Sequence, residues 1–223
     1  MPNEFDVNDG GEWFLVHSGA VTNTNPGSTV DVTINTEQIC PNMTNKEFRE
    51  MVLNKRNRAV ALVEARMKDL QRWSTADKAR VRQWFGRSDD ATRATLISGL
   101  SAIVRVLNKL TGSNFMRWDS ARYQYIGCVP NPNTSGVVAE VCSPDTATHT
   151  IAIHADFCTM RDFSWEKDSV VSTLIHEASH FSDTMGTKDH RYFMDKCLTL
   201  GTENPEQAIN NADSIAGYVI YNA

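Results

Sequence analysis

Hydrophobic residues recur every three or four positions from residue 44 to residue 73, which predicts one long amphipathic helix. Thr44 and Glu47 fit a capping box at its start. The same periodicity predicts two further helices over residues 74–85 and 88–110. Gly86 ends the first of these, and Thr111-Gly112 ends the second. Residues 44–112 are therefore expected to form a helical half.

The pattern changes after residue 112. Segments 122–129, 136–142 and 150–154 alternate apolar and polar residues in the manner of β strands. Helical periodicity returns around 167–181 and again over 204–220, where proline follows asparagine at the predicted start. The fold class predicted from this order is α+β, with a helical N-terminal half and a small twisted sheet.

Residues 1–43 are rich in Asn, Thr, Gly and Ser. Segments 12–17 and 29–34 could be short strands, because a turn signal at 25–27 separates them. We expect a hairpin or arm packed on the main body; a delivery or docking segment is the alternative. The predicted organisation is an arm over 1–43 and one domain over 44–223, divided into halves 44–112 and 113–223.

Composition narrows the function classes. The net charge of −5 and the pI near 5.7 argue against a broad nucleic-acid or anionic-membrane surface. No apolar run approaches the roughly 20 residues of a membrane span, and the acidic N-terminus lacks the features of a signal peptide. The protein is thus expected to stay cytoplasmic, to be exported by a route without a visible signal, or to have lost its signal.

The chain contains five cysteines, and this odd number leaves at least one unpaired within the chain. No C-x-x-C pair is present, which argues against a zinc finger or a thioredoxin-type site. Cys128, Cys142 and Cys158 lie close enough in sequence to hold one disulfide, although spacing alone does not give the connectivity.

The strongest chemical signal is H-E-x-x-H at His176, Glu177 and His180, inside a predicted helix. Two histidines four residues apart share one helix face, so both imidazoles can reach one metal ion. The glutamate between them can take a proton from bound water. The competing interpretation is a helix that carries two surface histidines without a metal.

A catalytic zinc site needs a third protein ligand and an open position for water. The pattern with a third histidine fails, since position 183 is Asp and position 186 is Gly. Glu203 and Glu206 lie downstream, but they lack the surrounding motif of thermolysin-like enzymes. Asp189 is the remaining option, in a turn that Gly186 permits, and the neighbouring His190 stays an alternative ligand.

H-E-x-x-H followed by G-T-K-D-H-R-Y over residues 186–192 resembles the signature of the aspzincins, the deuterolysin and peptidyl-lysine metalloendopeptidase family. The resemblance includes segments 84–86, 151–154 and 211–214, and it extends over roughly residues 50–220. It implies a zincin-like metalloprotease fold in which residues 44–223 form the catalytic domain. It also implies one catalytic zinc ion and a protein or peptide substrate.

The resemblance assigns roles to individual residues. His176, His180 and Asp189 would bind zinc, Glu177 would be the general base, and Tyr192 would donate its phenol to the oxyanion. Asp213 matches an aspartate of the pocket for the residue after the scissile bond, where a carboxylate attracts lysine or arginine. His154 is a further candidate for substrate binding on the predicted strand.

Three positions depart from the family pattern, among them His154, which stands where the family usually has an apolar residue or cysteine. The glycine after the tyrosine is Phe193 here, and the second acidic residue of the lysine-specific members is replaced by Ala216. We therefore expect a zinc endopeptidase, monomeric and without a nucleic-acid partner, that favours a basic residue after the scissile bond. The substrate would lie as an extended strand against the sheet edge near 151–154. The alternatives are an exported effector with a narrow protein or cell-wall amide target, and a catalytically silent binding module.

Overall fold

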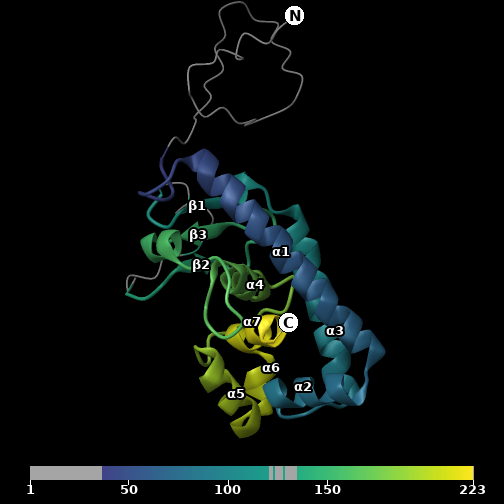
Figure 1. Ribbon diagram of the computed structural model, residues 1–223. Helices are drawn as coiled ribbons and strands as arrows, with labels where there is room; N and C mark the ends of the chain where they lie inside the picture. The colour runs from purple at the N-terminus through teal and green to yellow at the C-terminus, as the bar shows by residue number, and fades with distance from the viewer. Residues whose placement is uncertain (1–36, 121–122, 124–127, 129–134, 223) are drawn as a thin grey trace, which may run out of the picture.

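The computed structural model describes residues 37–120, 123, 128 and 135–222 (Figure 1). The strands proposed at 12–17 and 29–34 lie outside these residues, as does most of the segment 122–129. The α-helices and strands of the described residues are α1 (Asn45–Arg72), α2 (Thr75–Phe85), α3 (Asp90–Lys109), β1 (Phe115–Arg117), β2 (Ala139–Val141), β3 (Ile151–Ile153), α4 (Val170–His180), α5 (Met194–Glu203), α6 (Pro205–Ile209) and α7 (Ala212–Ile220), and two short 3-10 helices span Gly112–Asn114 and Ala155–Thr159.

The three predicted N-terminal helices are confirmed, and local capping sets their starts. The Thr44 hydroxyl accepts the Glu47 amide of α1, and the Glu47 carboxylate accepts the Thr44 amide in return. Ser74 and Asp77 form the same box on α2, and the Asp89 side chain caps α3. Helices α1 and α3 pack side by side along one flank of the molecule (Figure 1).

The sheet has the strand order β1-β3-β2. Strand β3 pairs parallel with β1 and antiparallel with β2. The strands expected at 136–142 and 150–154 are present in shorter form, while β1 was not predicted. Ile151 and Ile153 face the main core, and Ala152 contacts a second small cluster with Met116 and Tyr123 on the other face.

The C-terminal half departs further from the sequence prediction. Helix α4 begins at Val170, close to the predicted start, but α5 was not predicted. The single helix expected over 204–220 is wrong, since the chain forms α6 and α7 with a break at Asn210 and Asn211. The break has a physical cause, because the Asn211 side chain and nearby backbone groups bond to the loop before α5.

Two disulfides tie the described segments together. Cys40 pairs with Cys158, which holds the segment before α1 to the turn after β3, and Cys128 pairs with Cys142. Cys197 is free and buried in α5, so the odd count leaves one thiol as expected. Among the described helices, none combines the length and apolar character that a bilayer span requires.

Gly86 permits the close approach of α2 and α5. It adopts φ +69° at the end of α2, and a Cβ added there would lie 2.0 Å from the carbonyl oxygen of Gly201. Both the left-handed conformation and this contact disfavour any side chain.

We expect Gly86→Ala to lower the free energy of unfolding by about 2 kcal/mol more than Gly136→Ala, the size of an overpacking penalty. Gly136 is the matched control, since its φ is +76° but nothing lies within 4 Å of an added Cβ. Urea denaturation of both variants measures the difference. Equal losses would mean that α2 and α5 shift apart without cost.

Candidate metal centre and cleft

Helix α4 lies in the interior of the molecule and bears His176, Glu177 and His180 of the candidate site. It contacts α1, α3, α7 and β2, and its residues Leu174, Ile175 and Ala178 are fully buried. A helix covered on so many sides is held firmly in position and rotation. The side chains of His176, Glu177 and His180 therefore project from a rigid element.

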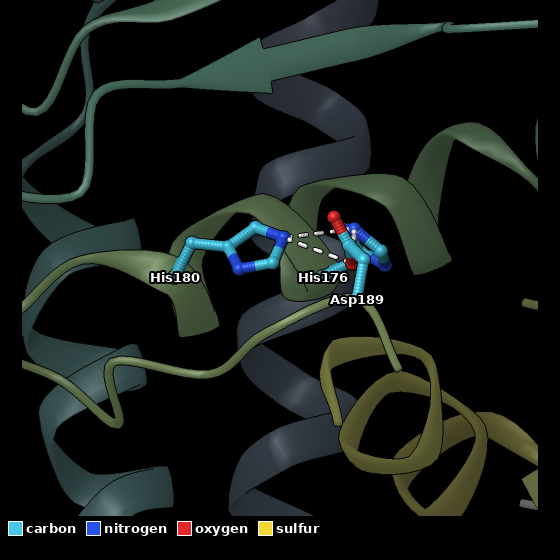
Figure 2. A group of neighbouring side chains, drawn as sticks. All are labelled: His176, His180 and Asp189. Atoms are coloured by element: carbon cyan, nitrogen blue, oxygen red, sulfur yellow. Dashed lines mark hydrogen bonds and ion pairs between the residues drawn. The ribbon is translucent and has the colours of Figure 1, made fainter. Parts of the chain in front are cut away.

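His176, His180 and Asp189 converge as the sequence predicted (Figure 2). The Nε2 atoms of the histidines are 3.0 Å apart, and the Oδ1 atom of Asp189 lies 3.2 Å from one and 3.3 Å from the other. Tetrahedral zinc with bonds of about 2.0–2.1 Å places its ligand atoms about 3.3 Å apart. The three donor atoms therefore fit the spacing of a zinc site.

On each histidine ring, a hydrogen bond at Nδ1 orients the Nε2 atom toward the other two candidate ligands. The Nδ1 of His176 lies 2.6 Å from Oδ1 of Asp213, and the Nδ1 of His180 donates to the Thr187 carbonyl at 2.9 Å. Because a carbonyl only accepts, the proton of neutral His180 sits on Nδ1 and the lone pair on Nε2. Asp213 holds His176 in the same tautomer. Sequence analysis assigned Asp213 to substrate binding and missed this second contact.

The buried side chain of Asn211 holds the loop that delivers Asp189. Its Oδ1 accepts the amides of His190 and Arg191 at 2.9 Å each, and its Nδ2 donates to the Arg191 carbonyl at 3.0 Å. The backbone of Lys188 also pairs with Asn210 and Ala212. Asn211 belongs to the segment that resembles the aspzincins, but nothing in the local sequence shows that its amide bonds to a loop twenty residues away.

Glu177 and Tyr192 line the same cleft as the three candidate metal ligands. Glu177 is 3% exposed, and its burial raises the pKa of the carboxyl group. The two histidines hold the pKa of Asp189 well below its usual range, although burial acts in the opposite direction. Burial and the nearby Asp189 carboxylate raise the pKa of Tyr192 to about 12, so its phenol stays protonated at neutral pH. A buried carboxyl group and a phenolic donor thus line the same cleft.

These residues line one cleft of about 570 Å³. Strand β2 forms one wall, and α4 and the loop over 187–193 form the other. Asp168 and Asp213 also line this cleft, and burial together with the charge of Asp213 raises the pKa of Asp168. Asp168 was not predicted as a site residue, since it lies eight residues before His176 and outside the motif. The cleft therefore contains Asp168 and Asp213 in addition to Glu140, Glu177 and the three candidate metal ligands.

The other candidate residues from the sequence lie outside the group formed by His176, His180 and Asp189. Glu203 pairs with Arg191 and Glu206 with Arg87, and neither joins the metal-binding group, nor does His190. His154 is buried, stacks on Trp118 with ring centroids 5.1 Å apart, and is not among the residues that line the cleft. This position does not support direct contact with a substrate. Glu140, whose Oε1 lies 3.6 Å from Nε2 of His154, does line the cleft.

A helix that carries H-E-x-x-H, completed by an aspartate from the following loop, defines a histidine–aspartate class of zincin-like metal sites. The chain belongs to the aspzincin M35 family: the family model, described as lysine-specific metallo-endopeptidase, matches residues 71–220. This match covers more than half of the chain, including the whole of the candidate site.

Individual relatives agree with the family. A peptidyl-Lys metalloendopeptidase from Armillaria mellea is 31% identical over 140 residues, which cover 63% of this chain and 34% of that protein. One from Pleurotus ostreatus is 31% identical over 147 residues, which cover 63% of this chain and 72% of that protein. A zinc peptidase structure from Grifola frondosa shares the fold, with a TM-score of 0.62 at 24% identity over 79% of this chain and 96% of that one.

Saturating zinc should stabilise the protein, because the folded state arranges three ligands that the unfolded chain does not. At about 100 times its dissociation constant, Zn²⁺ is expected to raise the melting temperature by about 5–10 °C. Asp189→Ala should lose most of this shift, and the matched neighbour His190→Ala should keep it. Calorimetry with and without zinc measures both. If His190→Ala lost the zinc-induced shift and Asp189→Ala kept it, His190 would be the third ligand.

Proposed function

We propose that the protein is a zinc-dependent endopeptidase with one zinc ion, acting as a monomer on extended protein or peptide substrates. The observation that carries the proposal is the convergence of His176, His180 and Asp189 beside a buried glutamate. The names of the Armillaria and Pleurotus relatives support the same activity. Two disulfides favour an oxidising, extracellular location.

The residues of the cleft divide the work of peptide hydrolysis. Zinc held by the two histidines and Asp189 would supply a Lewis acid that polarises the peptide carbonyl and acidifies water. Glu177 takes the proton from the attacking water, a task that suits a carboxylate whose pKa is raised by burial. Tyr192 donates its phenolic proton in a hydrogen bond to the developing oxyanion. Glu177 then passes its proton to the leaving amine.

Strand β2 is the part of the sheet that can hold the substrate. The expectation that the substrate lies along 151–154 is corrected, because β3 is the central strand and both its edges are paired. Strand β2 is at the edge of the described sheet and lines the cleft. An extended peptide that pairs with β2 would pass directly above Glu177 and the metal-binding residues.

Asp168 and Asp213 support a preference for lysine or arginine after the scissile bond. Asp213 already accepts His176 with one oxygen and the Phe193 amide with the other. Asp168 has no side-chain partner among the described residues, so its carboxylate is available to a substrate cation. It would supply the second acidic group that Ala216, buried in α7, does not.

Glu177→Gln should keep zinc and lose about 10²–10⁴-fold in turnover, because the amide cannot accept the proton. Mass-spectrometric mapping of cuts in a mixed peptide library measures the loss, and metal analysis checks the zinc. Glu166→Gln is the control, since Glu166 is exposed and lies outside the cleft. Full activity in Glu177→Gln would rule out the mechanism. Cuts in cell-wall fragments alone would favour an amidase, and zinc-independent binding of a partner would favour a silent module.

Asp168→Asn should lower kcat/KM for substrates with lysine after the scissile bond about tenfold relative to those with leucine, because a charge-assisted hydrogen bond is lost. Asp156→Asn serves as the matched control on an exposed aspartate that does not line the cleft. Zinc content should stay constant in both variants. An unchanged lysine-to-leucine ratio would remove Asp168 from the pocket.

A further inference from the structure

Phe193 has a backbone conformation that a residue with a Cβ rarely adopts. Its φ is +69° and its ψ is 137°, in a region that glycine occupies almost alone. It directly follows Tyr192, and it lines the cleft. The strained backbone lowers the stability of the folded state, so the phenylalanine at this position needs an explanation that glycine does not.

The backbone of Phe193 accounts for the conformation but not for the side chain. Its amide donates to Oδ2 of Asp213 at 2.9 Å, and its carbonyl accepts the Cys197 amide at 2.9 Å in the first turn of α5. The other oxygen of Asp213 bonds to His176, so this geometry is tied to the metal-binding residues. Glycine would make the same two backbone hydrogen bonds without strain.

The side chain of Phe193 is only partly covered by the fold. Phe193 is 54% exposed, which makes it one of three large exposed hydrophobic residues in the described part of the chain, together with Tyr192 and Trp165. The ammonium group of Lys196 lies over the ring, 5.0 Å from its centroid. More than half of the residue's surface thus remains in water at the edge of the cleft, where the ring is available to a ligand.

We propose that Phe193 forms an apolar subsite that packs against a large aliphatic or aromatic side chain of the substrate, beside the basic residue. This inference rests on the proposed peptidase function. The chemistry follows from the ring's surroundings: a lysine ammonium already lies over the ring, so a second cation is disfavoured and an apolar side chain is favoured. The preferred substrates then combine a basic residue, directed to Asp168 and Asp213, with an apolar neighbour.

The test is a peptide library with lysine fixed after the scissile bond and the flanking positions varied. The protein should favour leucine or phenylalanine over serine at one flanking position by about tenfold, which corresponds to burying roughly 50 Å² of apolar surface. Phe193→Ala and Phe193→Gly should lose this preference and still cut before lysine. Trp165→Ala is the matched control, an exposed aromatic that lies outside the cleft, and it should keep the profile.

Thermal stability provides a second readout that does not depend on activity. Phe193→Gly should melt at least about 2–4 °C above Phe193→Ala, since only glycine relieves the backbone strain. Phe193→Ala keeps the backbone strain and removes only the ring, so a melting temperature well below that of the unmodified protein would mean that the ring packs structurally, and it would overturn the subsite. If Phe193→Ala and Phe193→Gly cut with the same flanking preference as the unmodified protein, the subsite would be overturned and the peptidase function would stand. No Glu177-dependent cleavage of any peptide would overturn the peptidase function, and the subsite with it.

Discussion

The contact between His176 and Asp213 is the point on which the geometry of the site depends. One carboxylate oxygen fixes the imidazole so that its Nε2 faces His180 and Asp189, and the other oxygen receives the Phe193 amide. The side chain of Asp213, at the start of α7, thus joins α4 to the loop that carries Asp189 and Tyr192. Because a metal site tolerates only small displacements, a link of this kind is as important as the ligands themselves.

The scaffold makes this link possible by packing α4 against α7. The two helices pack against each other, and α4 also rests on α1, α3 and β2 (Figure 1). The break between α6 and α7 follows from the same requirement. A continuous helix over 204–220 would place Asn211 inside a helical turn, whereas the break frees its backbone and amide to hold the loop over 188–191. The helix is thus interrupted at the residue whose side chain binds the loop that carries Asp189.

The features that sequence analysis predicted correctly have local causes. The starts of α1 and α2 depend on side chains three residues apart, and Gly86 ends α2 through its own conformation. The proximity of the two histidines on α4 follows from helical spacing, and the place of Asp189 beside them follows from the resemblance; their role as zinc ligands stays a prediction. The features that were missed have distant causes. Helix α5, strand β1, the clamp of Asn211 and the place of Asp168 in the cleft all depend on partners far along the chain, which periodicity does not reveal.

The balance of charge explains why the site suits a divalent cation. Glu177, Asp189, Asp213 and Asp168 gather around two imidazoles in one cleft, and the pKa values of Glu177 and Asp168 are raised by burial and by neighbouring carboxylates. Carboxylates held this close repel one another unless a cation offsets their charge. A dication at the two Nε2 atoms and Asp189 would relieve that repulsion and leave Glu177 ionised. In the proposed enzyme, metal binding, the basicity of Glu177 and the attraction of a basic substrate would therefore draw on the same negative field.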